Sequence, residues 1–111
     1  HAMLQVPVSL LEERARNIAS SAAALGWEAE AAPLVAVAGG GTGTESTLPS
    51  FGVRLRHPSL GETEAAARLR SRELPVIVRI SEGRLVVDLR SVTPEEDDEI
   101  LSALGEALAR P

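Results

Sequence analysis

The stretch that decides the fold is PVIVRISEGRLVVDL, at residues 75–89. It contains two apolar runs, Val76–Ile80 and Leu85–Leu89, on either side of a short polar connection. A two-residue turn at Glu82-Gly83 predicts a β-hairpin, because glycine suits the tight turns that join antiparallel strands. The cross-strand pairs are then Ile80 with Leu85, Val78 with Val87, and Val76 with Leu89, which gives the hairpin one wholly apolar face.

The opposite face of this hairpin is mixed. Ile77 and Arg79 on the first strand, and Val86 and Asp88 on the second, point away from the apolar face. A small domain normally makes an outer face more polar, so the pattern predicts cover by another helix or an interface with a partner. The alternative is an ion pair between Arg79 and Asp88, which lie diagonal to each other in this register.

Three helices are predicted around the hairpin, at about residues 8–25, 61–72 and 94–109. Each begins with Ser or Thr followed three residues later by Glu, the capping-box pattern in which each side chain satisfies the other's free backbone N–H. Apolar residues at helical spacing follow each box, and Gly26 is the expected end of the first helix. The three boxes are Ser9 with Glu12, Ser59 with Glu62, and Thr93 with Glu96.

Two more strands are predicted between the first two helices. Residues 27–38 alternate as a half-buried strand does, and Pro33 within them is typical of an edge or bulged strand. Residues 39–50 are the one long loop, and the alternation of Phe51, Val53 and Leu55 predicts the second strand. The order α-β-β-α-β-β-α therefore predicts an α+β two-layer domain with a mostly antiparallel four-stranded sheet and helices on one face.

The composition excludes several kinds of site. A chain of 111 residues with a formal net charge of −5 is one domain's worth of polypeptide and a poor binder of phosphate backbones. The absence of cysteine excludes disulfides, zinc fingers, iron–sulfur clusters and thiol catalysis. All 11 basic residues are arginine, so no side chain can form a Schiff base or serve as a P-loop lysine.

The apolar runs and the first residues of the sequence indicate where the protein is located and whether it is part of a longer one. No apolar run approaches the ~18 residues that a membrane span needs, and no signal peptide is recognisable, so we expect a cytoplasmic protein without a membrane partner. His1-Ala2-Met3 is typical of a cloning remnant. We therefore expect residues 4–111 to be one domain of a longer protein.

Two features suggest ligand binding. The glycines Gly39, Gly40 and Gly41 form neither a P-loop nor a G-x-G-x-x-G motif, so the loop is either a flexible connection or a close backbone approach to a ligand or another domain. Arg90, just past the second hairpin strand, could bind a carboxylate or a phosphate through two parallel hydrogen bonds. A solvated or ion-paired arginine is the alternative.

Two other features favour structural interpretations. His57 lies at a strand end, and the sequence identifies neither a nucleophile nor an orienting partner for it, so we expect no general base there. The acidic run 95–99 lies in the first turns of a helix, where carboxylates complement the helix dipole. Adjacent helical positions do not face one another, so we expect no metal site in this run.

Taken as a set, a series of short segments resembles the C-terminal domain of the bacterial selenocysteine synthase family, L-seryl-tRNA(Sec) selenium transferase. The resemblance covers about residues 4–108 and is strongest from Pro75 onward. Its segments are Ala38-Gly39-Gly40-Gly41, Leu48-Pro49-Ser50, Ala67-Arg68-Leu69-Arg70, Pro75–Ile80, Gly83-Arg84-Leu85, Asp88-Leu89-Arg90, Val92 and Pro94–Asp97.

The resemblance implies a domain of a pyridoxal-phosphate enzyme of the aspartate-aminotransferase fold type. Such enzymes convert seryl-tRNA(Sec) to selenocysteinyl-tRNA(Sec) with selenophosphate and form large ring-like homo-oligomers. This chain would be their small C-terminal domain, which docks on the large domain and helps to close the substrate site. The cofactor lysine and the tRNA-recognition domain lie upstream in the family, so no catalytic residue is carried over and the fragment itself holds no cofactor.

In this fold type the small domain commonly contributes an arginine for the substrate carboxylate. By that analogy Arg79 and Arg90 are the candidates for binding a carboxylate or another anion, and Gly39, Gly40 and Gly41 are candidates for a loop facing the active site. Two other hypotheses remain open. One is a related pyridoxal-phosphate lyase acting on a small amino acid, and the other is a free-standing regulatory or dimerisation module with ferredoxin-like topology.

Overall fold

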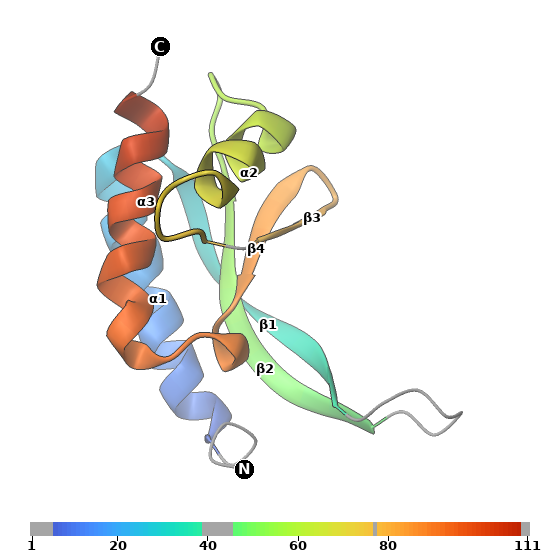
Figure 1. The fold of residues 1–111 in the computed structure, drawn as a ribbon. Coiled ribbons are helices and arrows are strands. Elements are labelled where there is room, and N and C mark those ends of the chain that lie inside the picture. Colours follow the sequence, from blue (N-terminus) through green and yellow to red (C-terminus); the bar gives the residue numbers. More distant parts are fainter. Residues whose placement is uncertain (1–5, 39–45, 77, 110–111) are drawn as a thin grey trace.

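The computed structural model describes residues 6–38, 46–76 and 78–109, and these contain three α-helices, four strands and two short 3₁₀ turns (Figure 1). The order of helices and strands is the predicted one. The elements are α1 (Val8–Leu25), β1 (Glu28–Ala38), β2 (Ser46–Arg56), α2 (Glu62–Arg70), β3 (Arg79–Ser81), β4 (Arg84–Asp88), η2 (Leu89–Ser91), η3 (Pro94–Glu96) and α3 (Asp97–Ala109).

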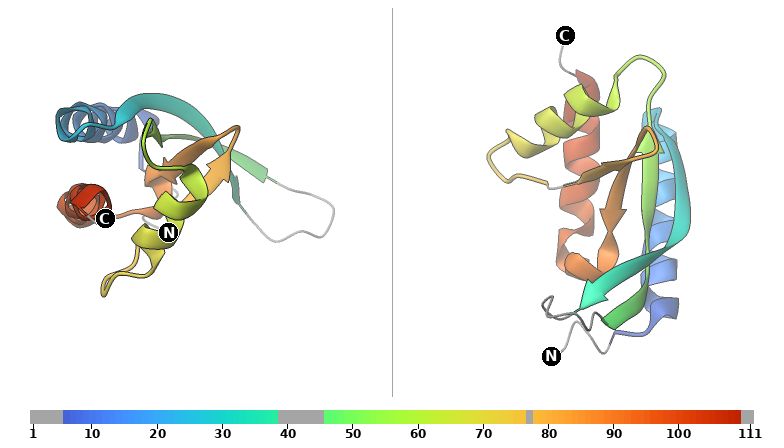
Figure 2. Two further views of the ribbon diagram at one scale, coloured as in Figure 1. Left: turned by 90° about the horizontal axis from the view of Figure 1, so that it is seen from above. Right: turned by 90° about the vertical axis from the view of Figure 1, so that its right-hand side faces the viewer.

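The four strands form one antiparallel sheet in the order β1-β2-β4-β3. Because β4 lies between β2 and β3, the unit β2-α2-β3 is a split β-α-β motif. Helix α1 packs on β1 and β2, α3 lies beside α1, and α2 lies over the β3–β4 hairpin (Figure 2). The prediction of an α+β fold with a four-stranded antiparallel sheet is confirmed.

One hydrophobic core joins the helices to one face of the sheet. From the sheet, Val53 and Leu55 on β2 and Leu85 and Val87 on β4 are each no more than 3% exposed. Burying a side chain of this size contributes about 1.5–3 kcal/mol to folding. The helices meet these residues with side chains from all three α-helices, among them Leu11, Ile18, Leu69, Ile100 and Leu104.

The hairpin turn forms as predicted, but the strand before it is short. Ile80 pairs with Leu85. The predicted strand from Val76 is wrong: β3 begins only at Arg79, and the backbone N–H of Val76 donates instead to the Leu69 carbonyl at the end of α2, at 2.9 Å. The pairs expected for Val76 and Val78 therefore lie outside the ladder, and Ile80 is 45% exposed rather than part of the core.

The turn itself supplies a test of stability. Glu82 and Gly83 have φ angles of 55° and 78°, the positive values that a type I′ turn requires at both positions. Asparagine adopts this conformation at lower cost than glutamate, so Glu82→Asn is expected to raise the free energy of unfolding by about 0.5–1 kcal/mol. Thermal unfolding followed by circular dichroism measures the change.

Glu73→Asn is the matched control, because it removes the same charge from another exposed position outside the turn. An equal gain in both variants would show that charge, and not backbone conformation, is responsible.

Only one of the three predicted capping boxes forms. Helix α1 begins after Pro7 and α2 after Gly61, and neither N-cap has a side-chain hydrogen bond. The boxes expected at Ser9 and Ser59 are therefore wrong, since Ser9 lies inside the first turn of α1. At the third helix the prediction is confirmed, because the Glu96 carboxylate accepts from the backbone N–H of Thr93 at 3.0 Å.

Strands β1 and β2 form a long two-stranded ribbon. They pair from Glu28 with Arg56 to Ala38 with Ser46, so the loop predicted at residues 39–50 is wrong over residues 46–50. Gly39, Gly40 and Gly41 lie outside the described residues. Because β4 pairs only with Gly52–Leu55, the far half of the ribbon extends past the rest of the sheet (Figure 1). Pro33 lies on the edge strand β1, as expected.

Trp27 joins the helices to the sheet. Gly26 ends α1 with a φ of 114°, and Trp27, which follows it, is only 3% exposed. Its indole Nε1–H donates to the Leu104 carbonyl of α3 at 3.2 Å. The bond satisfies the one polar group of a large buried ring and fixes the start of β1 against α3.

Candidate functional site

Two grooves lie on either side of the segment from Ser91 to Glu96. The first, here called the Arg79 groove, has a volume of about 630 Å³ and lies between the segment Leu74–Val76, β4 and the start of α3. Its apolar lining includes Val76 and Ile100. Its polar lining consists of Arg79, Asp88 and Ser91 and the glutamates Glu95, Glu96 and Glu99.

Arg79 is the cation of this groove. It lies exposed on β3 opposite Val86. Within residues 6–38, 46–76 and 78–109, its side chain makes no ion pair or hydrogen bond. The alternative ion pair with Asp88 is not formed, because the Asp88 carboxylate accepts from Ser50 Oγ at 2.5 Å and from the backbone N–H of Arg90 at 3.0 Å. As far as the described part of the chain goes, the Arg79 guanidinium is therefore available to a ligand.

Arg72 holds the wall of the Arg79 groove in place. Its guanidinium donates to the Glu99 carboxylate, to Glu106 Oε2 at 2.8 Å and to the Leu74 carbonyl at 2.8 Å. Hydrogen bonds to Glu106 and Glu99 favour the charged form, so the pKa of Arg72 lies above its ordinary value. Arg72 thus ties the segment after α2 to α3, and Glu99 is occupied by this contact.

Arg90 is placed differently from Arg79. It is only 8% exposed, and its guanidinium donates to the main chain: Nε and Nη2 to the Pro49 carbonyl at 3.1 and 2.5 Å, and Nη1 to the Val6 carbonyl at 3.1 Å. It thereby links the segment before α1, the ribbon strand β2 and the end of β4. The two arginines do not line one common groove, since Arg90 lines the second.

The second groove was not foreseen from the sequence. It is here called the Leu10 groove, has a volume of about 450 Å³ and lies between the start of α1 and the segment Val92–Pro94. Leu10 is 51% exposed, although its neighbour Leu11 is buried in the core. The only sequence signal is that Leu10 stands outside the apolar stripe of its helix. The apolar lining of the Leu10 groove comprises Val6, Leu10, Leu11, Leu89, Val92 and Pro94.

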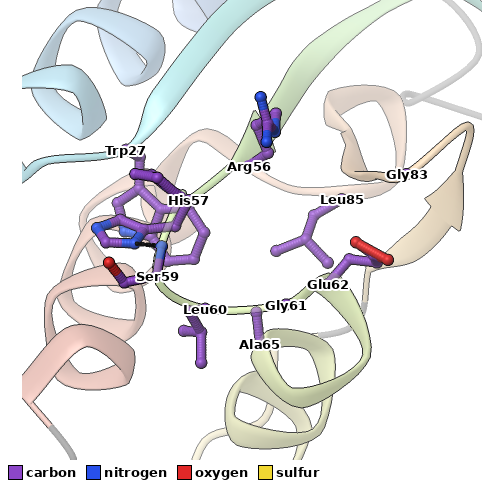
Figure 3. A pocket seen from close by; sticks show the side chains of 11 residues that line it. Trp27, Arg56, His57, Ser59, Leu60, Gly61, Glu62, Ala65, Gly83 and Leu85 are labelled. Atoms are coloured by element: carbon purple, nitrogen blue, oxygen red, sulfur yellow. Dashed lines mark hydrogen bonds between the residues drawn. The ribbon is translucent and has the colours of Figure 1, made fainter.

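A third cleft, of about 410 Å³, surrounds His57 and is drawn in Figure 3. His57 Nδ1 accepts from the backbone N–H of Ser59 at 3.1 Å, and its ring packs edge-on against Trp27 with centroids 5.6 Å apart. Arg56, at the rim, donates to Glu28 at 3.1 Å. These contacts give His57 a packing role, and no cysteine exists to act with it as a nucleophile.

Three further observations bear on the remaining classes of site. Among residues 6–38, 46–76 and 78–109, no group of three or more His, Asp or Glu residues is arranged to hold a metal ion. In the same residues no helix is both long and apolar enough to cross a membrane. Every buried side-chain nitrogen or oxygen in this part of the chain has a hydrogen-bond partner. The Arg79 groove is the best candidate for ligand binding, because an exposed arginine with no partner among the described residues lines it.

Comparison with known proteins gives a consistent result. The sequence model of the L-seryl-tRNA selenium transferase family matches residues 1–93. A protein of Aquifex aeolicus named L-seryl-tRNA(Sec) selenium transferase is 39% identical over 71 residues, or 64% of this chain. Proteins of the same name from Caldanaerobacter subterraneus and Helicobacter hepaticus are 34% and 31% identical, over 66% and 97% of this chain.

The chain is much shorter than these relatives. The matched region spans 16% of the Aquifex and Caldanaerobacter proteins and 24% of the Helicobacter protein. The similarity therefore concerns one part of each relative.

Proposed function

Because the chain belongs to the L-seryl-tRNA selenium transferase family, we propose that it is the C-terminal domain of an enzyme that converts seryl-tRNA(Sec) to selenocysteinyl-tRNA(Sec) with selenophosphate. The observation that carries the proposal is the family match over residues 1–93, together with relatives that share its name. The domain itself docks on the upstream large domain and helps to close the substrate site. We expect the whole enzyme to be a cytoplasmic homo-oligomer.

The cofactor belongs to the upstream part of the enzyme. Pyridoxal phosphate supplies the electron sink for loss of the seryl hydroxyl group when it is bound. A lysine of the upstream part would hold it, and this chain of 111 residues has no lysine. The residues of this domain accordingly bind and orient the substrate and exclude water from the site. They form no covalent bond to the cofactor.

Arg79 is the residue we assign to anion binding. The carboxyl group of the seryl residue is esterified to tRNA, so the anions that remain for an arginine are phosphate groups, on selenophosphate or on the tRNA. An exposed guanidinium with free donors suits such oxygens, because it can form two parallel hydrogen bonds. Arg90 is assigned a positioning role, since it holds β2 and the segment before α1 in place through the Pro49 and Val6 carbonyls.

The substitution Arg79→Gln tests this assignment in the full-length enzyme. Loss of a hydrogen-bonded charge of this kind costs about 1.5–3 kcal/mol, so kcat/KM is expected to fall roughly 10- to 100-fold. The measurement is steady-state conversion of seryl-tRNA(Sec) at varied selenophosphate. Arg84→Gln is the matched control, because Arg84 lies on the same hairpin but pairs with Glu30 at 3.1 Å. Equal kinetics in the wild type and Arg79→Gln would remove Arg79 from the site.

A second candidate function is favoured by the charge distribution of the same groove. Arg79 from β3 and Glu95 from η3 both line it. This arrangement is complementary to the carboxylate and ammonium groups of a free amino acid. The alternative is therefore a pyridoxal-phosphate lyase of the same family that acts on a small amino acid.

One experiment on the full-length protein separates the hypotheses. Visible absorption is recorded before and after borohydride reduction, and conversion of seryl-tRNA(Sec) with selenophosphate is then assayed. A band that reduction removes, together with the selenocysteinyl product, supports the transferase. The band without tRNA turnover favours the lyase. Absence of the band would contradict both enzymes and favour a free-standing regulatory or dimerisation module.

A further inference from the structure

The Leu10 groove lies beside the first described residue of the chain. Val6 forms part of its lining, and the Val6 carbonyl accepts from Arg90 Nη1 at 3.1 Å. Pro7 then caps α1. These contacts fix Val6, at the start of the backbone that leads into α1, beside the groove.

The two arginines that line the groove are engaged within the domain, and two glutamates, Glu13 and Glu95, also line it. Arg14 donates to Asp97 Oδ1 at 2.7 Å and to the carbonyls of Leu89 and Val92, at 3.4 and 3.0 Å. Arg90 donates to main-chain carbonyls, as described above. The groove therefore combines an apolar surface, on which Leu10 is half exposed, with carboxylates that disfavour an anion. Such a surface is complementary to apolar side chains and not to an anion.

We propose that the Leu10 groove receives an apolar segment from the upstream part of the same polypeptide. This inference rests on the proposed function, in which the chain is one domain of a larger enzyme. In the proposed enzyme, of which this chain is the C-terminal domain, upstream polypeptide would make up most of the length, since the matched region spans only 16% of the Aquifex relative. A tethered segment acts at an effective concentration of about millimolar, so a few apolar side chains suffice to occupy the groove.

A second copy of the chain is a poorer occupant. The groove has room for a few side chains, with a volume of about 450 Å³. A stable interface between separate proteins buries about 800 Å² on each partner. The groove alone would not supply that area, whereas an intramolecular contact needs much less because no translational freedom is lost.

The test replaces the exposed leucine in the full-length enzyme. In Leu10→Glu, the charged group would have to be buried against the docked segment, so the segment is expected to leave. Hydrogen exchange of the backbone amides from Leu89 to Val92, across the groove, is then expected to be about tenfold faster than in the wild type. Leu25→Glu is the matched control, because Leu25 is 44% exposed at the other end of the same helix.

Two further measurements make the result decisive. In the 111-residue chain, Leu10→Glu is expected to leave both the thermal midpoint and the exchange of this segment unchanged, which separates lost docking from local unfolding. Equal exchange in full-length wild type and Leu10→Glu would overturn the proposal. Protection that falls on dilution would also overturn it, in favour of a second copy. Failure of the transferase assay would contradict the proposed function but leave the exchange comparison intact.

Discussion

Gly52→Ala is expected to destabilise the domain strongly. A Cβ atom on Gly52 would lie 2.1 Å from the Val87 carbonyl oxygen and 2.5 Å from Leu34 Cδ1. The first contact is with backbone, so a side-chain rotation cannot relieve it. Strands β2 and β4 would have to separate where they hold the core together. The cost is expected to be at least about 3 kcal/mol, at the upper end of what overpacking a core produces.

Gly105→Ala is the control for this substitution. Nothing lies within 4 Å of a Cβ added to Gly105, which stands within α3. Alanine is the better helix former, so this variant is expected to gain up to about 1 kcal/mol. Chemical denaturation followed by circular dichroism measures both. A Gly52→Ala protein with wild-type stability would mean that β2 and β4 are farther apart than described.

Trp27→Ala is expected to produce the second large loss of stability. The indole is 3% exposed, packs against His57 and donates to the Leu104 carbonyl of α3. Removing a buried aromatic side chain of this size costs about 3–5 kcal/mol, because a cavity remains where β1 meets α3. Thermal unfolding followed by circular dichroism in the far ultraviolet measures the loss.

Trp27→Phe separates the volume of the ring from its hydrogen bond. It keeps an aromatic ring but removes the Nε1–H donor, so a smaller loss than that of Trp27→Ala is expected. Equal losses in the two variants would show that the bond to Leu104, and not the packed volume, dominates. A Trp27→Ala protein as stable as the wild type would contradict the burial of this residue.

Local signals predicted the fold where the contacts are local. The Glu82-Gly83 turn fixes the register of its hairpin through neighbouring residues alone, and the Thr93 capping box acts within one turn of helix. Contacts between distant elements decided the rest. The sequence Val76–Ile80 has the pattern of a strand, but the Val76 N–H is taken by the end of α2. The Ser9 box fails because Pro7, with its fixed φ, already starts the helix.

The candidate site was likewise predictable only where it depends on local sequence pattern. Alternation in the hairpin placed Arg79 on the outer face, where the structure has it exposed in a groove. The sequence made Arg90 an equal candidate for anion binding. Its hydrogen bonds go instead to the Pro49 and Val6 carbonyls, which are 41 and 84 residues away along the chain. The Leu10 groove depends on the packing of α1 against the Val92–Pro94 segment, which no local pattern encodes.

The position of Trp27 has a spectroscopic consequence. It is the one tryptophan of the chain, and tyrosine is absent, so ultraviolet emission excited at long wavelength comes from a single ring. That ring lies in an apolar setting beside an imidazole and far along the chain from Arg79. The emission of the 111-residue chain therefore records whether the sheet and α3 remain joined. Unchanged emission while a ligand is added to the Arg79 groove would show that the fold is undisturbed.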